Sequence, residues 1–140
     1  MSSLQNLLLR QYFKIAGKNK TAENHSLEKS RKNINTLSAI SKLPAGVVYK
    51  EENCSGVFCE WAIPKNKNNN GVVLYFHGGA FVSGSIKTHR ALVGRLARAS
   101  KTQCISVEYR LAPENPYPAA LNDAIAVYLW LLKNNYKHII

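Results

Sequence analysis

Hydrophobic and polar residues follow two different periods along this chain, and the period changes near residue 46. Before that point, apolar residues recur every three or four positions, which is the spacing of an amphipathic helix. The pattern predicts one helix from Leu4 to Ile15 and a second from about Ser26 to Leu43. Each helix has a single apolar stripe and must pack against another surface. We therefore expect residues 1–45 to form a helical cap that lies on the core or covers a pocket as a lid.

After the change, short apolar runs bounded by turn-forming residues predict strands. Runs at 47–49 and 56–63, with a turn near 53–55 between them, predict an antiparallel pair. Beyond a polar loop the pattern predicts, in order, a strand at 72–76, a helix over about 85–100, a strand at 103–108 and a helix over about 118–133. Strands separated by helices of this length form right-handed parallel crossover units. The predicted fold class is α/β.

The two later helices each have an apolar stripe that we expect to pack on the sheet. The stripe of the helix over 85–100 consists of Leu92, Val93, Leu96 and Ala97. The stripe of the helix over 118–133 consists of Leu121, Ala124, Ile125, Tyr128, Leu131 and Leu132.

Composition and charge exclude several classes of function. The 140 residues are 46% hydrophobic, enough for one core, and carry a net charge of +11. The basic residues are scattered singly, which favours a solvated surface over a nucleic-acid or membrane-binding face. Three cysteines without paired metal-ligand spacing favour a reduced, cytoplasmic protein with no metal. The sequence contains no recognisable signal peptide, membrane span or cofactor motif.

The clearest candidate for chemistry is the glycine loop, residues 77–85, which directly follows the strand at 72–76. Gly78 and Gly79 have no Cβ, so their N–H groups are able to approach an anionic atom closely. Ligands of such sheets bind beyond the carboxyl ends of the strands, where this loop lies. Two alternatives follow, a phosphate cradle or an oxyanion hole. The loop lacks the glycine spacing and the Gly-Lys-Ser/Thr ending of phosphate-binding loops, which disfavours the first.

Two motifs together resemble the hormone-sensitive-lipase-like esterases of the α/β-hydrolase superfamily, the bacterial acetyl esterase/lipase type. They are His-Gly-Gly-Ala-Phe at 77–81 and Tyr-Arg-Leu-Ala-Pro-Glu-Asn-Pro-Tyr-Pro-Ala-Ala at 109–120. The resemblance implies that the N–H groups of Gly78 and Gly79, with that of Ala80 nearby, form the oxyanion hole of a carboxylic ester hydrolase. It implies a small-molecule acyl ester as substrate, no cofactor, and a structural role for His77. Ala80 departs from the usual third glycine.

The second motif, residues 109–120, is expected to support the glycine loop. Its three prolines stiffen the turn, and Pro118 suits the first position of a helix. Arg110 has both Glu114 and Asp123 within reach for an ion pair. A carboxylate such as Asp123 near a helix start is favourable without any catalytic role.

The sequence contains no catalytic triad. None of its serines has a glycine two residues before and two residues after it, as the nucleophile elbow Gly-x-Ser-x-Gly requires. In the family the last predicted helix leads into the strand that carries the nucleophile, and residues 138–140 are expected to begin that strand. We therefore expect residues 46–140 to be an incomplete α/β-hydrolase core, the N-terminal half, ending before the elbow and inactive alone. The alternative is a non-enzymatic binding protein, or one that a second chain with Gly-x-Ser-x-Gly complements.

Overall fold

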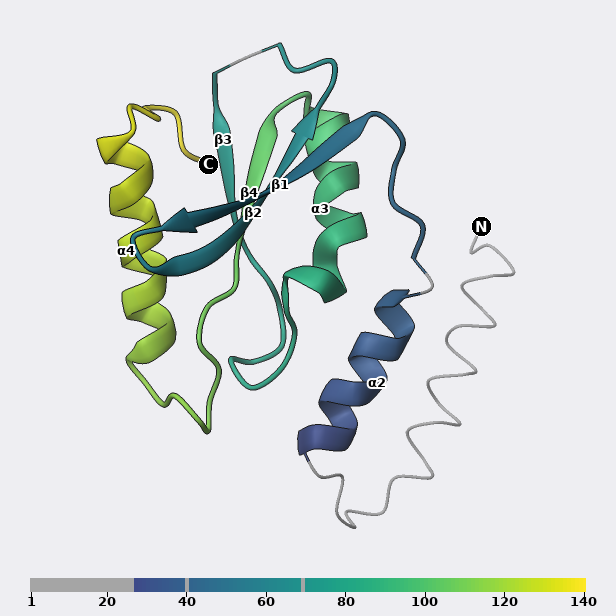
Figure 1. The fold of residues 1–140 in the computed structure, drawn as a ribbon, viewed down its shortest axis with the longest axis vertical. Helices are drawn as coiled ribbons and strands as arrows, with labels where there is room; N and C mark the ends of the chain where they lie inside the picture. The colour runs from purple at the N-terminus through teal and green to yellow at the C-terminus, as the bar shows by residue number, and fades with distance from the viewer. Residues whose placement is uncertain (1–26, 40, 69) are drawn as a thin grey trace, which may run out of the picture.

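The computed structural model describes residues 27–39, 41–68 and 70–140, and Figure 1 shows how their elements are arranged. In chain order the elements are α2 (Leu27–Ala39), β1 (Val47–Cys54), β2 (Val57–Pro64), β3 (Val72–Phe76), α3 (Ile86–Ser100), β4 (Gln103–Val107) and α4 (Ala119–Lys133). The helix expected from Leu4 to Ile15 lies outside the described residues. Helix α4 begins at Ala119, so Pro118 directly precedes the helix and does not occupy the first helical position that the sequence predicted for it.

The boundaries of the early elements differ from the predicted ones. Helix α2 ends at Ala39, not near Leu43, because the chain must leave the helix to reach the turn at Gly46 that opens β1. Gly46 has a φ of 77°, a left-handed conformation that favours glycine, and its carbonyl oxygen accepts a hydrogen bond from the Lys65 N–H at 2.8 Å. Strand β1 extends to Cys54, well beyond the predicted end at Tyr49.

The four strands form one mixed sheet in the order β1-β2-β4-β3. Strand β2 is antiparallel to both β1 and β4, whereas β3 and β4 are parallel, with Val72 opposite Gln103 and Phe76 opposite Val107. Helix α3 makes the crossover between β3 and β4. This confirms the predicted α/β class and the predicted sequence of an antiparallel pair followed by a parallel unit.

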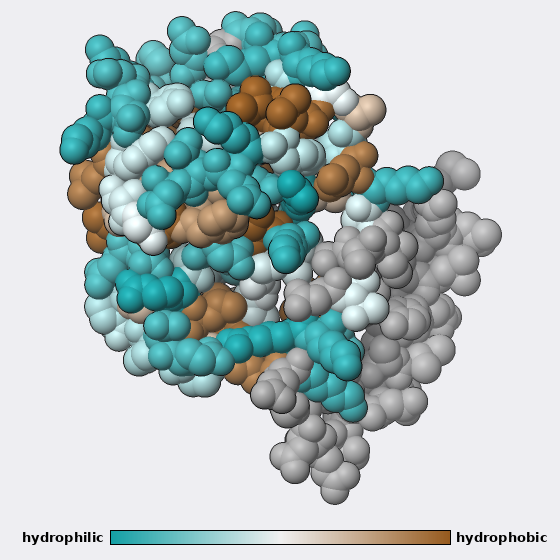
Figure 2. All heavy atoms as spheres, viewed as in Figure 1, coloured by the Kyte–Doolittle hydropathy of each residue, from teal (hydrophilic) through white to brown (hydrophobic). Residues whose placement is uncertain are grey.

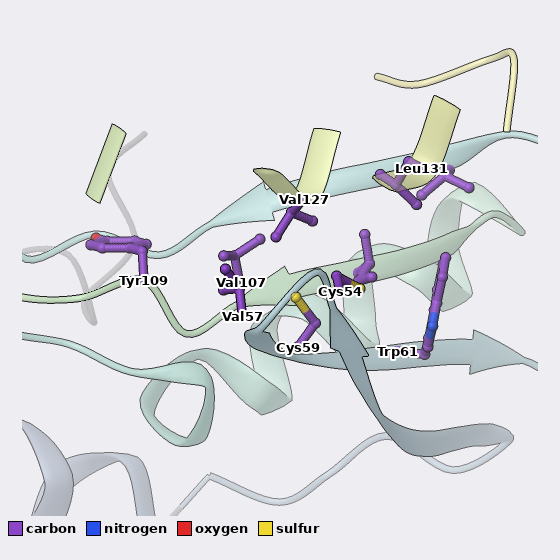
Figure 3. Close-up of a cluster of buried hydrophobic side chains, with 10 residues drawn as sticks. Cys54, Val57, Cys59, Trp61, Val107, Tyr109, Val127 and Leu131 are labelled. Atoms are coloured by element: carbon purple, nitrogen blue, oxygen red, sulfur yellow. The ribbon is translucent and has the colours of Figure 1, made fainter. Parts of the chain in front are cut away.

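Helices α3 and α4 lie on opposite sides of the sheet, and a separate apolar cluster fills the space under each (Figure 1). Successive residues of β4 point to opposite faces, so Ile105 and Val107 pack toward α4, whereas Cys104 packs toward α3. The cluster beneath α4 also contains Trp61 and Leu131 (Figure 3). All five residues of β4 are buried, as expected for a central strand covered on both faces.

The predicted packing stripe of α3 is wrong for two of its four residues. Val93 and Ala97 are buried against the sheet, but the side chains of Leu92 and Leu96 are 52% and 38% exposed. Gly94 is also buried, and a Cβ on it would overlap the Tyr49 hydroxyl. Small residues therefore allow α3 to approach the sheet closely, and the larger leucines point away from it.

The predicted packing stripe of α4 is also largely wrong. Val127 and Leu131 face the sheet and are fully buried. The other large residues of the predicted stripe are between 44% and 48% exposed, namely Leu121, Ile125, Tyr128 and Leu132. Apolar side chains reach the surface on the side of the molecule where α4 lies (Figure 2). Helix α4 is apolar on two sides, and periodicity alone does not distinguish which side covers the sheet.

The end of the chain adds a parallel pairing beside β3. Ile139 forms a parallel bridge with Val72, and three backbone hydrogen bonds of 2.9 Å connect residues 138–140 to Val72 and Leu74. Figure 1 shows the C-terminus next to this edge of the sheet. This agrees with the prediction that residues 138–140 begin a strand. No helix within the described ranges is long and apolar enough to cross a membrane.

Candidate functional site

The glycine loop reverses the chain immediately after β3. Gly79 has a φ of 134°, and the two residues that follow, Ala80 and Phe81, have left-handed φ values of 53° and 62°. The N–H groups of Val82 and Ser83 both donate to the Gly79 carbonyl oxygen at 3.0 Å. A Cβ at position 79 would overlap the Ser83 carbonyl group. The turn therefore requires glycine at this position.

The N–H groups of Gly78, Gly79 and Ala80 make no hydrogen bond to any residue that the structure describes. All three residues line one wall of a cavity of about 790 Å³. Backbone N–H groups in folded proteins are almost always paired. Three consecutive unpaired donors beside a cavity are therefore available to an acceptor from outside the loop.

The rest of the cavity wall is mostly apolar. It is formed by the end of β3, the second motif and the first turns of α4, with lining residues Phe76, His77, Phe81, Tyr109, Arg110, Ala112, Asn115, Tyr117, Pro118, Ala120, Leu121 and Ala124. Such a wall excludes water around any bound acceptor and strengthens the hydrogen bonds that it receives.

His77 is the first residue of the glycine loop and is only 5% exposed. Its Nδ1 atom is 3.0 Å from the Gly78 carbonyl oxygen and 3.2 Å from the Tyr109 hydroxyl, which donates to the His77 carbonyl oxygen at 2.5 Å. The His77 and Tyr109 rings stack with centroids 4.1 Å apart. Burial lowers the pKa of His77 below its ordinary value, although the hydrogen bond to Gly78 opposes this. The lowered pKa disfavours a charged ring, and the ring packs within the loop.

The two serines of the loop are bonded to nearby backbone atoms. The Ser83 hydroxyl donates to the Gly79 carbonyl oxygen at 3.1 Å. The Ser85 hydroxyl accepts from the Thr88 N–H at 3.2 Å and caps α3, and the Glu108 carboxylate accepts from the Ile86 N–H at 2.6 Å. Because this first turn of α3 already has a carboxylate partner, the geometry does not favour a phosphate site there.

Arg110 and Asp123 form the ion pair that the sequence predicted. The Arg110 guanidinium bonds to both carboxylate oxygens of Asp123 at 2.7 to 3.1 Å, and the Arg110 N–H donates to the same carboxylate at 2.9 Å. Burial raises the pKa of Asp123, but the hydrogen bonds and charge of Arg110 outweigh this effect and hold the pKa below its ordinary value. The pair connects the start of the second motif to α4.

The predicted contact between Arg110 and Glu114 is replaced by a different one. Glu114 binds Arg31 of α2, with both carboxylate oxygens 2.8 to 2.9 Å from guanidinium nitrogens. Hydrogen bonding to Arg31 lowers the pKa of Glu114 to about 2. Arg31 also donates to the carbonyl oxygens of Val82, at 2.8 Å, and Ala112, at 2.9 Å. Arg31 could not be predicted from the sequence, because its partners lie more than 50 positions away and no local pattern marks it.

The three cysteines are buried free thiols. A hydrogen bond between the side chains of Cys54 and Cys59 raises the pKa of Cys59, and burial raises the pKa of Cys104 to about 11. No group of three or more potential metal ligands occurs in the described part of the chain. The cysteines therefore belong to the core.

Three comparisons with known proteins agree with one another. Residues 73–139 match the family model described as alpha/beta hydrolase fold. An esterase of Mycobacterium tuberculosis, LipI, is 49% identical over 63 residues, which are 45% of this chain and 20% of that protein. The structure of an esterase from the bacterial hormone-sensitive lipase family has a TM-score of 0.83 at 29% identity. An esterase/lipase from an uncultured bacterium has a TM-score of 0.86 at 32% identity.

Both structural matches cover 99% of this chain and 47% of the other chain, so this chain spans about half the length of these relatives. The described residues have the fold of an α/β-hydrolase, and residues 73–139 match that family model. Among α/β-hydrolases the chain is similar to esterases of the hormone-sensitive-lipase-like type, which confirms the resemblance predicted from the two motifs.

Proposed function

We propose that this chain provides the oxyanion hole of a carboxylic ester hydrolase. The observation that carries the proposal is the row of three N–H groups, at Gly78, Gly79 and Ala80, that bond to none of the described residues and lie on the wall of an apolar cavity. When a nucleophile attacks an ester carbonyl, the carbonyl oxygen becomes negative. Donors fixed in advance stabilise that charge, each by about 3–4 kcal/mol in the transition state.

The supporting residues have separate roles in this proposal. His77, at the start of the glycine loop, stacks on Tyr109, whose hydroxyl donates to the His77 carbonyl oxygen and keeps the loop backbone in place. Arg110 and Asp123 hold the second motif against α4. Glu114 anchors Arg31, whose guanidinium reaches the loop itself.

The nucleophile, acid and base of the reaction come from residues other than these 140. Ser83 and Ser85 are bonded within the loop and its helix, and no Gly-x-Ser-x-Gly sequence is present. Residues 46–140 are, in this proposal, the core segment that contains the oxyanion hole, and residues 1–45 are its cap. Within the part of the chain that the structure describes, no group is positioned to form an acyl intermediate.

We infer that a further polypeptide segment supplies these groups by packing on β3 and α4. The edge of β3 is paired with residues 138–140 only as far as Leu74, and one apolar side of α4 is exposed. An additional parallel strand would satisfy that edge, and the helix that follows such a strand would cover apolar surface.

A chimera tests the function. In it, residues 1–140 replace the equivalent segment of the structurally similar bacterial esterase of the hormone-sensitive lipase family, which keeps its own downstream residues. We expect the chimera to hydrolyse a short-chain p-nitrophenyl ester, and the 140-residue chain alone to show essentially no turnover, since loss of the nucleophile costs about a millionfold. A folded chimera without turnover, or serine-dependent turnover by the chain alone, would contradict the proposal.

A further inference from the structure

The glycine loop contains two residues in a conformation that needs outside support. Ala80 and Phe81 both have positive φ values, 53° and 62°. A non-glycine residue in this region is strained and persists only where its surroundings hold it. Contacts from outside the loop must therefore hold the backbone after Gly79.

Two consecutive carbonyl groups of the loop are anchored from outside it. The Phe81 carbonyl oxygen accepts from the Ala112 N–H of the second motif at 2.9 Å. The next one, the Val82 carbonyl oxygen, accepts from the Nε of Arg31 at 2.8 Å. The first anchor comes from the core, whereas the second comes from α2, which precedes the sheet in the chain.

Arg31 is itself fixed by the second motif. Its remaining nitrogens bind the Ala112 carbonyl oxygen and both oxygens of the Glu114 carboxylate. One planar guanidinium thus joins three segments, and its fork of donors matches a carboxylate in a way that a lysine ammonium does not. A lysine at this position would keep the charge but not all of these bonds.

We propose that Arg31 is a positioning residue for the glycine loop, so that the docking of α2 and the order of the loop are coupled. Its catalytic meaning rests on the proposed oxyanion function of Gly78 and Gly79, but the coupling itself does not. Coupling between two sites is reciprocal. Loss of Arg31 must therefore loosen the loop, and loss of its Glu114 anchor must loosen α2.

Amide hydrogen exchange of the full 140-residue chain tests whether loss of Arg31 loosens the glycine loop. The probes are the N–H groups of Val82, Ser83 and Ala112, which are hydrogen bonded in the loop or to it. In Arg31→Met and Arg31→Lys we expect these amides to exchange at least about tenfold faster, with amides of the β2–β4 pairing within about twofold of wild type. Lys32→Met, an exposed neighbour on the same helix, is the matched control and should change none of them.

The same measurement on Glu114→Gln tests whether loss of the Glu114 anchor loosens α2. Glu52→Gln is the control, because among the contacts described Glu52 is paired only with Lys50 on the surface. Glu114→Gln should speed exchange in α2, whereas the control should not. Unchanged loop amides in Arg31→Met, unchanged α2 amides in Glu114→Gln, or an equal rise in the sheet would each overturn the coupling. These results are independent of the chimera: turnover without local exchange changes defeats the coupling alone, and exchange changes without turnover defeat the proposed function alone.

Discussion

At the scale of single residues, the two glycines of the loop are not equivalent. Gly79 has a φ that only glycine adopts readily, and a Cβ there would overlap the Ser83 carbonyl group. Gly78 has no such φ, and a Cβ on it would meet nothing closer than the His89 Nε2 atom at 3.9 Å. The sequence shows two adjacent glycines, but only one of them is required by the backbone.

This difference gives a matched pair of variants. Gly79→Ala should lower the free energy of unfolding by at least about 1–3 kcal/mol, the usual cost of a strained backbone, and should reduce turnover of the chimera strongly. Gly78→Ala should change the unfolding free energy by less than about 1 kcal/mol. Urea unfolding and ester turnover of the chimera are measured for each of the two variants. Equal effects of the two substitutions would mean that the loop has a different conformation.

A second prediction at this scale concerns the Glu114 carboxyl. Its pKa is about 2 because Arg31 stabilises the charged form. A carboxyl whose folded pKa is lowered contributes stability that is present above its unfolded pKa, roughly 4.3, and lost as the pH falls toward 2. Carbon-13 NMR titration should give a midpoint near 2 in wild type and near about 4.3 in Arg31→Met. A wild-type midpoint in the ordinary range would show that the ion pair does not persist in solution.

At the scale of elements, the Arg110–Asp123 pair fixes how α4 meets the second motif. Asp123 is buried and accepts one backbone and several guanidinium hydrogen bonds, whereas Arg110 is half exposed. Removal of a charge partner in the interior costs about 3–5 kcal/mol, and less where solvent reaches the remaining charge.

We therefore expect Asp123→Ala to lower the free energy of unfolding by about 2–4 kcal/mol. Glu51→Gln, which changes an exposed carboxylate on β1, should cost less than about 0.5 kcal/mol. Denaturant unfolding followed by tryptophan fluorescence compares them, because Trp61 lies in the cluster under α4. If Asp123→Ala lowered the unfolding free energy no more than the control does, the Arg110–Asp123 pair would not stabilise the fold.

The elements themselves could be predicted from the sequence, but the faces of the helices could not. Alternation and turn residues locate every strand, since they depend on local properties of the chain. Helices α3 and α4 carry apolar residues on more than one side, so periodicity cannot select the buried one. Tertiary features decide it: Gly94 allows a close approach to Tyr49, and Asp123 binds Arg110.

The candidate site could be predicted in part for the same reason. The glycine loop and the Arg110–Asp123 contact come from short motifs that lie close in the sequence. The contact between Arg31 and Glu114 spans 83 positions, and nothing near either residue indicates it. The family resemblance suggested a support role for Glu114, but not the helix that it supports.

At the scale of the whole molecule, the exposed apolar side of α4 predicts association. Leu121, Ile125, Tyr128 and Leu132 are all close to half exposed on one helix. Patches of this kind are uncommon on monomers. We expect the 140-residue chain to elute above its monomer mass of 15.6 kDa in size-exclusion chromatography.

Substitution of Ile125 and Leu132 by lysine should shift the elution toward the monomer, because charge on the patch opposes its burial. Leu92→Lys on α3 serves as a control for an added charge elsewhere. A monomeric wild-type chain, or an equal shift by the control, would mean that this side of α4 does not associate.

The parallel bridge between Val72 and Ile139 also fixes the register of any strand that is joined to the chain at Ile140. Phe76 lies four residues after Val72, so the fourth residue after Ile139, which is the third after Ile140, would stand beside Phe76 in an unbroken register. Parallel strands advance by about 3.3 Å per residue. A join made at Ile140 therefore leaves about 10 Å of strand before the backbone draws level with Phe76, the last residue of β3. One residue too many or too few would turn every following side chain to the opposite face of the sheet.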